Sequence, residues 1–464
     1  MKKVFELKME GDVHTPIGIY RSIRDKKKIL LESSLKHEQQ GRYSFIGASP
    51  YKELYTAGGV TIEKNADGFR KEHPGRFLDI VKRLIPKETG LSNAYPFIGG
   101  AVGYVGYDII REYEDIGDIP DDQLNMPDAH LMFFSEVIVY DHMLHQISIV
   151  SIGDEAEEPA FLAKAEILAA TIRNVRQQEH EDSMAKSDAH FTSGRKKEEF
   201  ERMVRAAKKE IERGEIFQVV LSERFSADFS GDAFQFYRSL RKQNPSPYMF
   251  YIDFEDYQIV GSSPESLLKG DGRQVHTNPI AGTRRRGLTP EEDHALEAEL
   301  LEDVKELAEH KMLVDLGRND LGKVCGIGTV ELTKFMEIEK YKYVMHIVSE
   351  VAGIMREDLE NTDVLASCLP AGTVSGAPKI RAMSIINEFE RVKRGVYGGA
   401  VGYFSSHGAF DFALAIRTMV VKDGKATIQA GAGIVHDSDP EREYEEVLNK
   451  ARALMEVQYD LVNR

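Results

Sequence analysis

The chain has 464 residues, of which 42% are hydrophobic, so it is an ordinary globular protein long enough for two or three domains. Its net charge of −16 argues against a nucleic-acid-binding or anionic-membrane-binding surface. Two cysteines, Cys325 and Cys368, cannot build a disulfide framework; without a signal-peptide pattern or a membrane-length apolar run, we expect a cytoplasmic protein.

The first part of the chain, to about residue 176, is predicted to be a β-rich α+β domain. Short apolar or alternating runs such as KKILLES, VTIEK, EVIVYDH and HQISIVSI are broken by turn residues. The glycine-rich segment 95–108 predicts a strand with close backbone approach. Its Gly99-Gly100-x-x-Gly103 lacks the strand, fingerprint and helix order of a dinucleotide site. A helix is predicted over about residues 156–178, and the polar run 180–194 then marks a domain boundary.

The next part of the chain predicts alternating helices and strands. Residues 196–213 present one apolar helical face, and Gly214 ends that helix. In the following strand, FQVVLS, alternation places Gln218, Val220 and Ser222 on one face. The sequence SSPESLL then places Glu265 directly after a proline at a strand end, a position usual for a cap or a surface residue.

Two helices carry paired glutamates. After the run PIAGTRRRG, an acidic helix over residues 301–322 carries Glu306 and Glu309 at i and i+3, so both carboxylates lie on one face. Near the end of the chain, Asp439 is predicted to cap a helix that carries a second such pair, Glu443 and Glu446. If the helices face each other, four carboxylates meet and require a hard cation such as Mg²⁺. The alternative is two solvated helix faces in an acidic chain.

Arginine is locally dense at 284–286, which could serve an anionic substrate, although a solvated loop is the favoured interpretation. The glycine-rich runs AGT, GGAVG and GAG are expected to be loops whose backbone N–H groups could bind a carboxylate.

Seven runs in fixed order connect the chain to a known family. They resemble the chorismate-utilising enzymes, most closely the large subunits of anthranilate synthase, strongly over residues 195–464 and in a few places before them. The runs are PIAGTRRRG, KELAEHKMLVDLGRNDLG, VMHIVSEV, LPAGTVSGAPKIRAM, YGGAVGYFS, AIRT and IQAGAGIVHDSDPEREYEEVLNKARAL.

The resemblance implies a fold class, a domain division and a site. The fold is α+β, with a β-rich N-terminal domain over residues 1–185 that carries a tryptophan-binding element. The catalytic domain over residues 195–464 has the chorismate-binding α/β fold with antiparallel sheets and flanking helices. The implied catalytic residues are Glu265 as general acid, His346 and Thr373; the substrate-binding residues are Gly282, Thr283, Tyr397, Arg417, Gly431, Ala432, Gly433 and Lys450; the Mg²⁺ ligands are Glu306, Glu309, Glu443 and Glu446.

The implied reaction converts chorismate and ammonia to anthranilate and pyruvate, with feedback inhibition by tryptophan. The inhibitor is expected to lie between LLESS and NPSPYMF, against Glu32, Ser33, Pro247, Tyr248 and Met249. Because neither cysteine lies in a glutaminase motif, ammonia is expected from a separate glutamine amidotransferase subunit.

Two positions discriminate among relatives. Enzymes that add water have a lysine where this chain has Gln218, and aminodeoxychorismate synthases often have a lysine where it has Ala281. Both positions favour anthranilate synthesis. The alternatives are an aminodeoxychorismate synthase large subunit and a tryptophan-binding regulatory subunit without catalytic activity.

Overall fold

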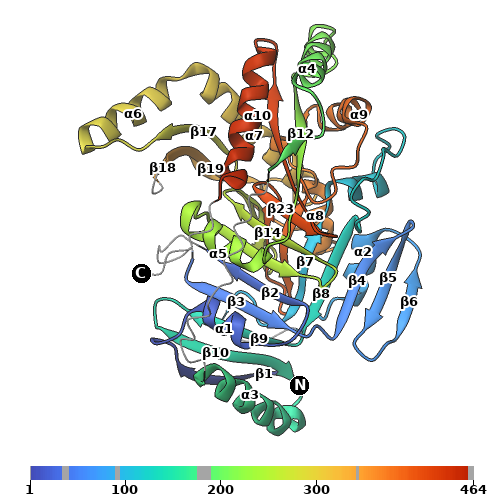
Figure 1. Cartoon of the computed structure of the whole chain (residues 1–464), viewed down its shortest axis with the longest axis vertical. Helices are drawn as coiled ribbons and strands as arrows, with labels where there is room; N and C mark the ends of the chain where they lie inside the picture. The colour runs from blue at the N-terminus through green and yellow to red at the C-terminus, as the bar shows by residue number, and fades with distance from the viewer. Residues whose placement is uncertain (1, 34–40, 89–94, 175–189, 341–343, 458–464) are drawn as a thin grey trace.

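Two large antiparallel sheets, each of 12 strands, organise the protein (Figure 1). This computed structural model describes residues 2–33, 41–88, 95–174, 190–340 and 344–457. Among them, no helix combines the length and the apolar character needed to cross a bilayer.

The first sheet joins strands from both ends of the chain, so that β2 pairs with β13 and Glu32 lies opposite Met249. Its order is β1 (Lys3–Glu10), β10 (Gln146–Gly153), β9 (Glu136–Asp141), β3 (Tyr43–Ala48), β2 (Lys28–Glu32), β13 (Tyr248–Asp253), β14 (Tyr257–Ser263), β23 (Thr418–Lys422), β24 (Lys425–Ile434), β12 (Gln218–Asp228) and β11 (Thr192–Ser193), with β20 (Gly376–Ala377) also paired to β12.

The second sheet also joins strands from both parts of the chain, since β7 pairs with β21 and Gly103 lies opposite Gly402. Its order is β17 (Ile280–Arg285), β19 (Val344–Ile354), β16 (Gln274–Thr277), β15 (Ser266–Asp271), β22 (Phe410–Leu414), β21 (Ala400–Ser405), β7 (Gly100–Val105), β8 (Ala129–Phe134), β4 (Lys52–Ala57), β5 (Val60–Asn65) and β6 (Arg70–His73), with β18 (Glu331–Lys340) paired to β19.

One hydrophobic core lies between the sheets. Ile29 and Phe250 of the first sheet share one buried cluster with Val102 and Met132 of the second. Strands buried on both faces lose the polar alternation of a surface strand, which explains the continuous apolar runs in this part of the sequence. At Gly103 a Cβ would collide with the carbonyl of His130, so the glycine-rich segment has the structural role predicted for it.

Helices cover the outer faces of the sheets (Figure 1). α1 (Pro16–Ser22), α3 (Glu158–Arg173) and α5 (Ala233–Gln243) pack on the first sheet; α2 (Phe77–Leu84), α7 (Val304–Gly322) and α8 (Asn361–Cys368) pack on the second. α4 (Lys197–Glu212), α9 (Lys379–Glu390) and α10 (Pro440–Met455) surround β12 and β24. The remaining helices are α6 (Pro290–Glu302) and the 3₁₀ turns η1 (Tyr107–Glu112), η2 (Glu155–Glu157) and η3 (Gly372–Val374).

Several predicted elements need correction. The helix predicted over residues 156–178 begins at Glu158, after a 3₁₀ turn, and ends at Arg173. The acidic helix is divided at Asp303, whose extended backbone ends α6 and whose side chain caps α7 by accepting from two backbone N–H groups. Of the polar run 180–194 expected to mark the domain boundary, residues 180–189 lie outside the described residues. Both sheets contain strands from before and after it.

Candidate active site

Glu265 lies at the junction of β14 and β15, where Pro264 ends one strand before the next begins at Ser266. The hydroxyl of Thr373, in η3, donates a hydrogen bond of 2.9 Å to its carboxylate. Burial raises the pKa of Glu265 to about 7, against the opposing effects of the Thr373 hydrogen bond and the charge of Lys450. A carboxyl group with this pKa can hold and donate a proton near neutral pH.

Arg417 supplies an anion-binding group near this acid. It occupies the turn between β22 and β23 with a φ of 47°, in the left-handed region that non-glycine residues rarely adopt. Burial lowers the pKa of its guanidinium, and no described carboxylate forms an ion pair with it. Together with Glu446 and Lys450 it lines a cavity of about 570 Å³. An arginine that lines a cavity and pairs with no described carboxylate is suited to bind an anionic ligand.

Two of the three glycine runs expected to form loops, AGT and GAG, lie within strands. Gly431 and Gly433 are in β24, and a Cβ at Gly431 would lie 2.6 Å from the hydroxyl oxygen of Tyr397, so only glycine admits the tyrosine there. A Cβ at Gly433 would collide with the amide nitrogen of Gln218. Between them, Ala432 packs into the core, which leaves only its backbone for a ligand. Gly282 of AGT lies in β17, so the loop prediction was wrong for AGT and GAG, whereas Gly398 and Gly399 of GGAVG lie in the turn that leads into β21.

His346 lies beside the PIAGT strand. Its Nδ1 is 3.0 Å from the hydroxyl of Thr283 and 3.1 Å from the carbonyl oxygen of Gly282, across the β17–β19 ladder. Burial lowers the pKa of this imidazole, and the nearby charge of Arg417 acts in the same direction. His346 is therefore held neutral near neutral pH, next to the residues assigned to the substrate.

The two glutamate pairs face each other across the site. Glu306 and Glu309 on α7 interact electrostatically with Glu446 on α10, and Glu446 in turn with Glu443. Burial is the main cause that raises the pKa values of Glu306, Glu309 and Glu443. Lys450 binds Glu446 at 2.7 Å and donates to the carbonyl of Gly431 at 3.1 Å, which links the cluster to β24.

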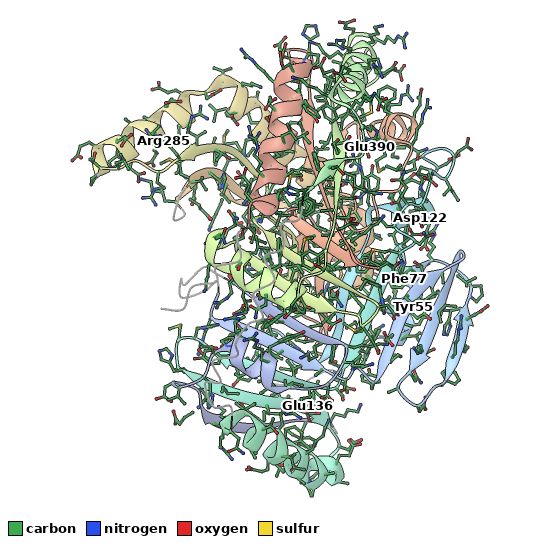
Figure 2. The ribbon with its side chains drawn as sticks, in the orientation of Figure 1. Tyr55, Phe77, Asp122, Glu136, Arg285 and Glu390 are labelled. Atoms are coloured by element: carbon green, nitrogen blue, oxygen red, sulfur yellow. The ribbon has the colours of Figure 1, made fainter. Side chains whose placement is uncertain are left out.

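The arginine run is not a solvated loop, contrary to the favoured interpretation. Arg284 and Arg285 end β17, and each of the three arginines pairs with an acidic residue on or beside α6. The ion pairs are Arg284 with Glu299 and Asp303 (2.8 Å each), Arg285 with Glu292 (2.5 Å) and Arg286 with Asp293 (2.7 Å). Figure 2 shows Arg285 on the projecting arm formed by β17 and α6. The run therefore secures α6 to the second sheet.

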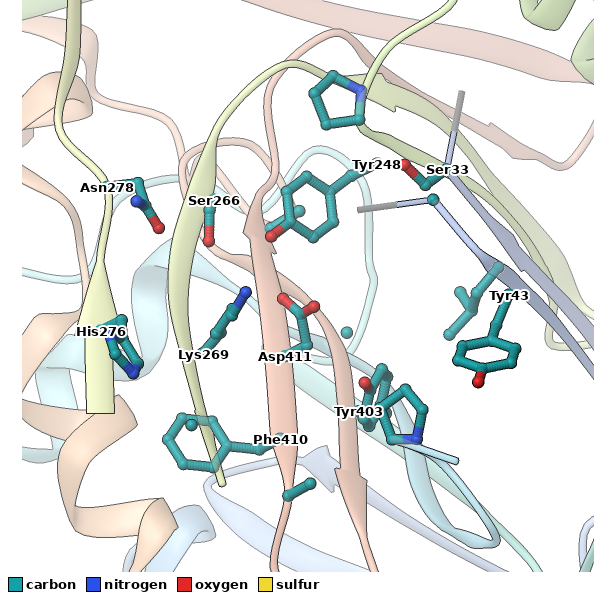
Figure 3. A pocket seen from close by; sticks show the side chains of 18 of the residues that line it. Ser33, Tyr43, Tyr248, Ser266, Lys269, His276, Asn278, Tyr403, Phe410 and Asp411 are labelled. Carbon is teal, nitrogen blue, oxygen red and sulfur yellow. The ribbon is translucent and has the colours of Figure 1, made fainter. Parts of the chain in front are cut away.

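The five residues predicted to bind tryptophan line a separate cavity of about 630 Å³. The ends of β2 and β13 bring Glu32 and Ser33 beside Pro247, Tyr248 and Met249, because these two strands pair directly. Figure 3 shows Ser33 and Tyr248 close together in the upper part of the view of this cavity. The volume is within the usual range for small-molecule sites.

Three further lining residues, Tyr43, Tyr403 and Asp411, are not among the predicted ones (Figure 3). They come from β3, β21 and β22, and no local motif connects them in sequence. Burial raises the pKa of Asp411 to about 6, and Tyr248 forms a hydrogen bond to it.

The carboxylate of Glu32 is already bound within the protein. It accepts from the hydroxyl of Tyr237 at 2.6 Å and pairs with Arg241 at 2.9 Å, both on α5. A ligand ammonium would therefore have to compete with Arg241 for this carboxylate, which the sequence did not indicate.

Comparison with known proteins defines the class of this fold and site. The model of the chorismate binding enzyme family matches residues 26–456. Anthranilate synthase component I from Streptococcus pneumoniae superposes with a TM-score of 0.82 at 41% identity, covering 96% of this chain and 98% of that one. A menaquinone-specific isochorismate synthase from Escherichia coli, 17% identical with a TM-score of 0.73, shares the fold.

The nearer sequence relatives give the particular family. Anthranilate synthase component 1 of Acetivibrio thermocellus is 46% identical over 97% of this chain and 94% of its own. The protein of the same name from Lactococcus lactis is 44% identical over 98% and 100%, respectively. The chain therefore belongs to the anthranilate synthase component 1 family of chorismate-binding enzymes, in agreement with the resemblance and with the α+β fold expected from it.

Proposed function

We propose that the chain is the large subunit of an anthranilate synthase, which converts chorismate and ammonia to anthranilate, pyruvate and water. The observation that carries the proposal is the combination of a carboxyl with a pKa of about 7 at Glu265 and a guanidinium at Arg417 that pairs with no described carboxylate, with Lys450 close to both. The first suits proton donation to a leaving hydroxyl, and the second suits a substrate carboxylate.

In the proposed reaction, the bond between the ring and its hydroxyl oxygen breaks while ammonia forms a C–N bond to the ring. Glu265 donates the proton that lets this oxygen leave as water, because hydroxide is a poor leaving group. Arg417, Tyr397 and the backbone of β24 hold a substrate carboxylate. Loss of the enolpyruvyl group as pyruvate, with removal of a ring proton, then makes the ring aromatic.

The four glutamates suit a Mg²⁺ ion. Within the residues that the structure describes, no three His, Cys, Asp or Glu side chains are close enough together to hold a metal ion. The donor chemistry nevertheless fits, since all four donors are carboxylates from two facing helices and burial already disfavours the charges of Glu306, Glu309 and Glu443. When bound, Mg²⁺ would polarise and orient the ring carboxylate of chorismate. Glu306, Glu309, Glu443 and Glu446 would hold it, some of them through water.

Gln218 supports ammonia rather than water as the nucleophile. Its amide lies against Gly433 in the candidate substrate cradle, and an amide cannot act as the base that activates water. Ala281, in β17, offers no lysine nucleophile of the kind that many aminodeoxychorismate synthases use.

Both cysteines are unsuited to release ammonia from glutamine. Cys325 and Cys368 are buried, and burial raises the pKa of the Cys368 thiol to about 12, so its thiolate is scarce at neutral pH. We infer that a separate glutamine amidotransferase subunit supplies the ammonia and that free ammonium replaces it at high concentration and alkaline pH.

Incubation with chorismate, Mg²⁺ and ammonium tests the proposal. Anthranilate, followed by its fluorescence, is the expected product. If 4-aminobenzoate appeared instead after a lyase was added, the chain would be an aminodeoxychorismate synthase subunit. If neither amine formed, the regulatory alternative would hold.

Arg417→Lys is expected to raise the KM for chorismate by about 10- to 100-fold. A lysine keeps the charge but cannot form the two parallel hydrogen bonds of a guanidinium to a carboxylate. Steady-state kinetics with chorismate as the varied substrate measure the effect. The control is Arg442→Lys, an exposed residue on the rim of the same cavity. A normal KM in the Arg417 variant would remove this residue from the substrate site.

We also propose that tryptophan binds in the cavity between β2 and β13 and inhibits the enzyme from there. Hydrogen bonds connect this cavity to the substrate site: the hydroxyl of Ser262 donates to the carbonyl of Asn244 at 2.5 Å, and the backbone N–H of Ser262 donates to the carbonyl of Arg417 at 3.1 Å. Asn244 begins the turn that contains Pro247. A coupling of about 1–3 kcal/mol would weaken chorismate binding by roughly 5- to 150-fold.

Ser33→Leu is expected to relieve inhibition by tryptophan without lowering uninhibited activity, because the larger side chain would fill part of the cavity. The chain contains no tryptophan, so binding can be followed by the fluorescence of the ligand itself. Ser230→Leu, in an exposed loop, is the control and should stay inhibited. If millimolar tryptophan leaves the wild type uninhibited, the regulatory site is wrong.

A further inference from the structure

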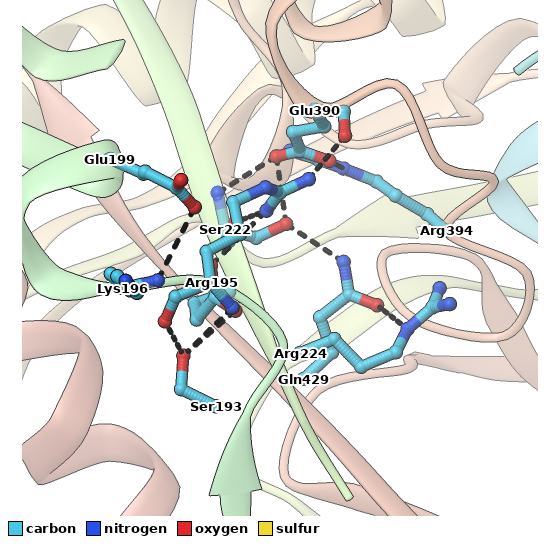
Figure 4. A network of polar contacts seen from close by, with 10 residues as sticks. Ser193, Arg195, Lys196, Glu199, Ser222, Arg224, Glu390, Arg394 and Gln429 are labelled. Carbon is cyan, nitrogen blue, oxygen red and sulfur yellow. Dashed lines mark hydrogen bonds and ion pairs between the residues drawn. The ribbon is translucent and has the colours of Figure 1, made fainter. Parts of the chain in front are cut away.

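A buried arginine lies beneath the residues assigned to the substrate. Arg394, between α9 and β21, is 2% exposed. Its Nε and Nη2 donate to the two carboxylate oxygens of Glu390, the last residue of α9, at 2.8 and 2.6 Å. Figure 4 shows this pair as part of a polar network, and Figure 2 marks Glu390.

The same guanidinium binds two main-chain segments of the candidate active site. Nη1 donates to the carbonyl of Val374 at 2.6 Å, and Nη2 to the carbonyl of Val220 at 2.8 Å. Val374 follows Thr373, the residue that donates to Glu265. Val220 lies opposite Gly433 in the β12–β24 ladder. The Arg394 side chain therefore joins the segment that orients the Glu265 carboxyl to the β12–β24 strand pair, which contains Gly431 and Gly433.

Arg394 also contacts the tyrosine of that cradle. Its guanidinium carbon is 5.4 Å from the ring centroid of Tyr397 and 4.7 Å from that of Tyr107. Tyr397 in turn reaches Gly431 with its hydroxyl. The planar fork of arginine can satisfy a carboxylate, two carbonyls and an aromatic face at once, which a lysine ammonium cannot.

The counter-ion is itself held in place. The backbone N–H and the hydroxyl of Ser222 both donate to Glu390 at 2.8 Å, and Gln429 donates to Ser222 at 2.8 Å (Figure 4). A buried ion pair is weak support for stability, since apolar residues of similar volume often stabilise a fold as well. The directional contacts of this pair to active-site backbone point instead to a geometric role.

We propose that Arg394 is a positioning residue of the active site, which acts through Thr373 on Glu265 and through Tyr397 on the bound carboxylate. It touches neither substrate nor reacting atoms. The inference rests on the proposed function, because it concerns how that reaction's acid and anchor are held.

Arg394→Lys is expected to lower kcat by about 10- to 100-fold and to raise the KM for chorismate, because a shift of about 1 Å in a catalytic group has effects of this size. Arg224→Lys is the matched control. Arg224 is buried in the same network and donates to Gln429 and to the carbonyl of Lys393, but not to Thr373, Val374 or Tyr397. Its variant should keep kcat.

Two measurements separate positioning from a general loss of structure. The Thr373 hydrogen bond lowers the pKa of Glu265. Both Thr373→Val and Arg394→Lys should therefore shift to higher pH the fall of kcat that accompanies deprotonation of Glu265. If Arg394 acts through Thr373, the double variant should lose much less activity than the product of the two single losses. Independent, multiplicative losses would refute the coupling.

A second variant covers the case in which a lone buried lysine prevents folding. Arg394→Met combined with Glu390→Met removes the pair without leaving an unpaired charge, and it should melt near the wild-type temperature while kcat stays low. Normal kcat in this folded variant would refute the positioning role. The wild type is the reference throughout: if it formed no anthranilate, the proposed function would fail, whereas an active wild type with equally active variants would refute this inference alone.

Discussion

Glu265→Gln is expected to lower kcat for anthranilate formation by about 10²- to 10⁴-fold, with little change in the KM for chorismate. Glutamine retains the size and the hydrogen-bonding oxygen that Thr373 contacts, but it cannot release a proton to the departing hydroxyl. The effect should appear in kcat because the proton is transferred in the transition state. Steady-state rates with saturating ammonium measure it. Full activity would remove Glu265 from the mechanism.

The pH dependence gives an independent check on the same group. Burial raises the pKa of Glu265 to about 7, and the acid form is the active one, so kcat at a fixed concentration of free ammonia should fall as the pH rises through about 7. Glu112→Gln is the matched control, because Glu112 is also a carboxyl whose pKa burial raises to about 7, but it accepts from the backbone of Phe77 at the start of α2. That variant should keep both the wild-type kcat and the fall of kcat as the pH rises through about 7.

Removal of divalent cations with EDTA is expected to abolish anthranilate formation, and added Mg²⁺ to restore it. Without a cation, Glu306, Glu309, Glu443 and Glu446 would face the carboxylates of chorismate directly, which opposes binding. Glu309→Gln should lower both the affinity for Mg²⁺ and the turnover, each by about 10- to 100-fold, with the affinity measured by titration calorimetry.

Glu441→Gln is the control for that variant. Glu441 also lies on α10, but it is exposed and pairs with Lys197 of α4. Its removal should change neither metal affinity nor rate. Undiminished turnover in EDTA would contradict the metal site, and loss of activity in the Glu441 variant would mean that general acidity of α10, not the four-glutamate cluster, is responsible.

Local features of the site could be predicted because they depend on periodicity and capping. The i, i+3 spacing of Glu443 and Glu446 fixes their shared face, and Asp439 caps α10 through the backbone N–H groups of residues 441 and 442, as predicted. The strand that carries Gln218 also follows from its sequence. These features require only a few neighbouring residues.

The features that sequence did not reveal depend on tertiary packing. Strand partners in sheets buried on both faces are chosen by the whole core, so the pairing of β2 with β13 has no local signal. Asp411 and Tyr403 reach the tryptophan cavity only because β21 and β22 are adjacent. The sequence favoured a solvated loop at Arg284 because its acidic partners, on and beside α6, lie further along the chain by the length of a whole helix.

The interleaving of early and late strands also governs how the chain must mature during synthesis. β2 is made early, yet one of its edges stays open until β13 leaves the ribosome, and β7 likewise waits for β21. An unfinished chain therefore displays unpaired strand edges, which can pair with other chains. Pairings so distant in sequence also make folding slow. A nascent chain of this protein should consequently depend on chaperones until its C-terminal strands are complete, and a fragment that ends near residue 185 should aggregate rather than fold.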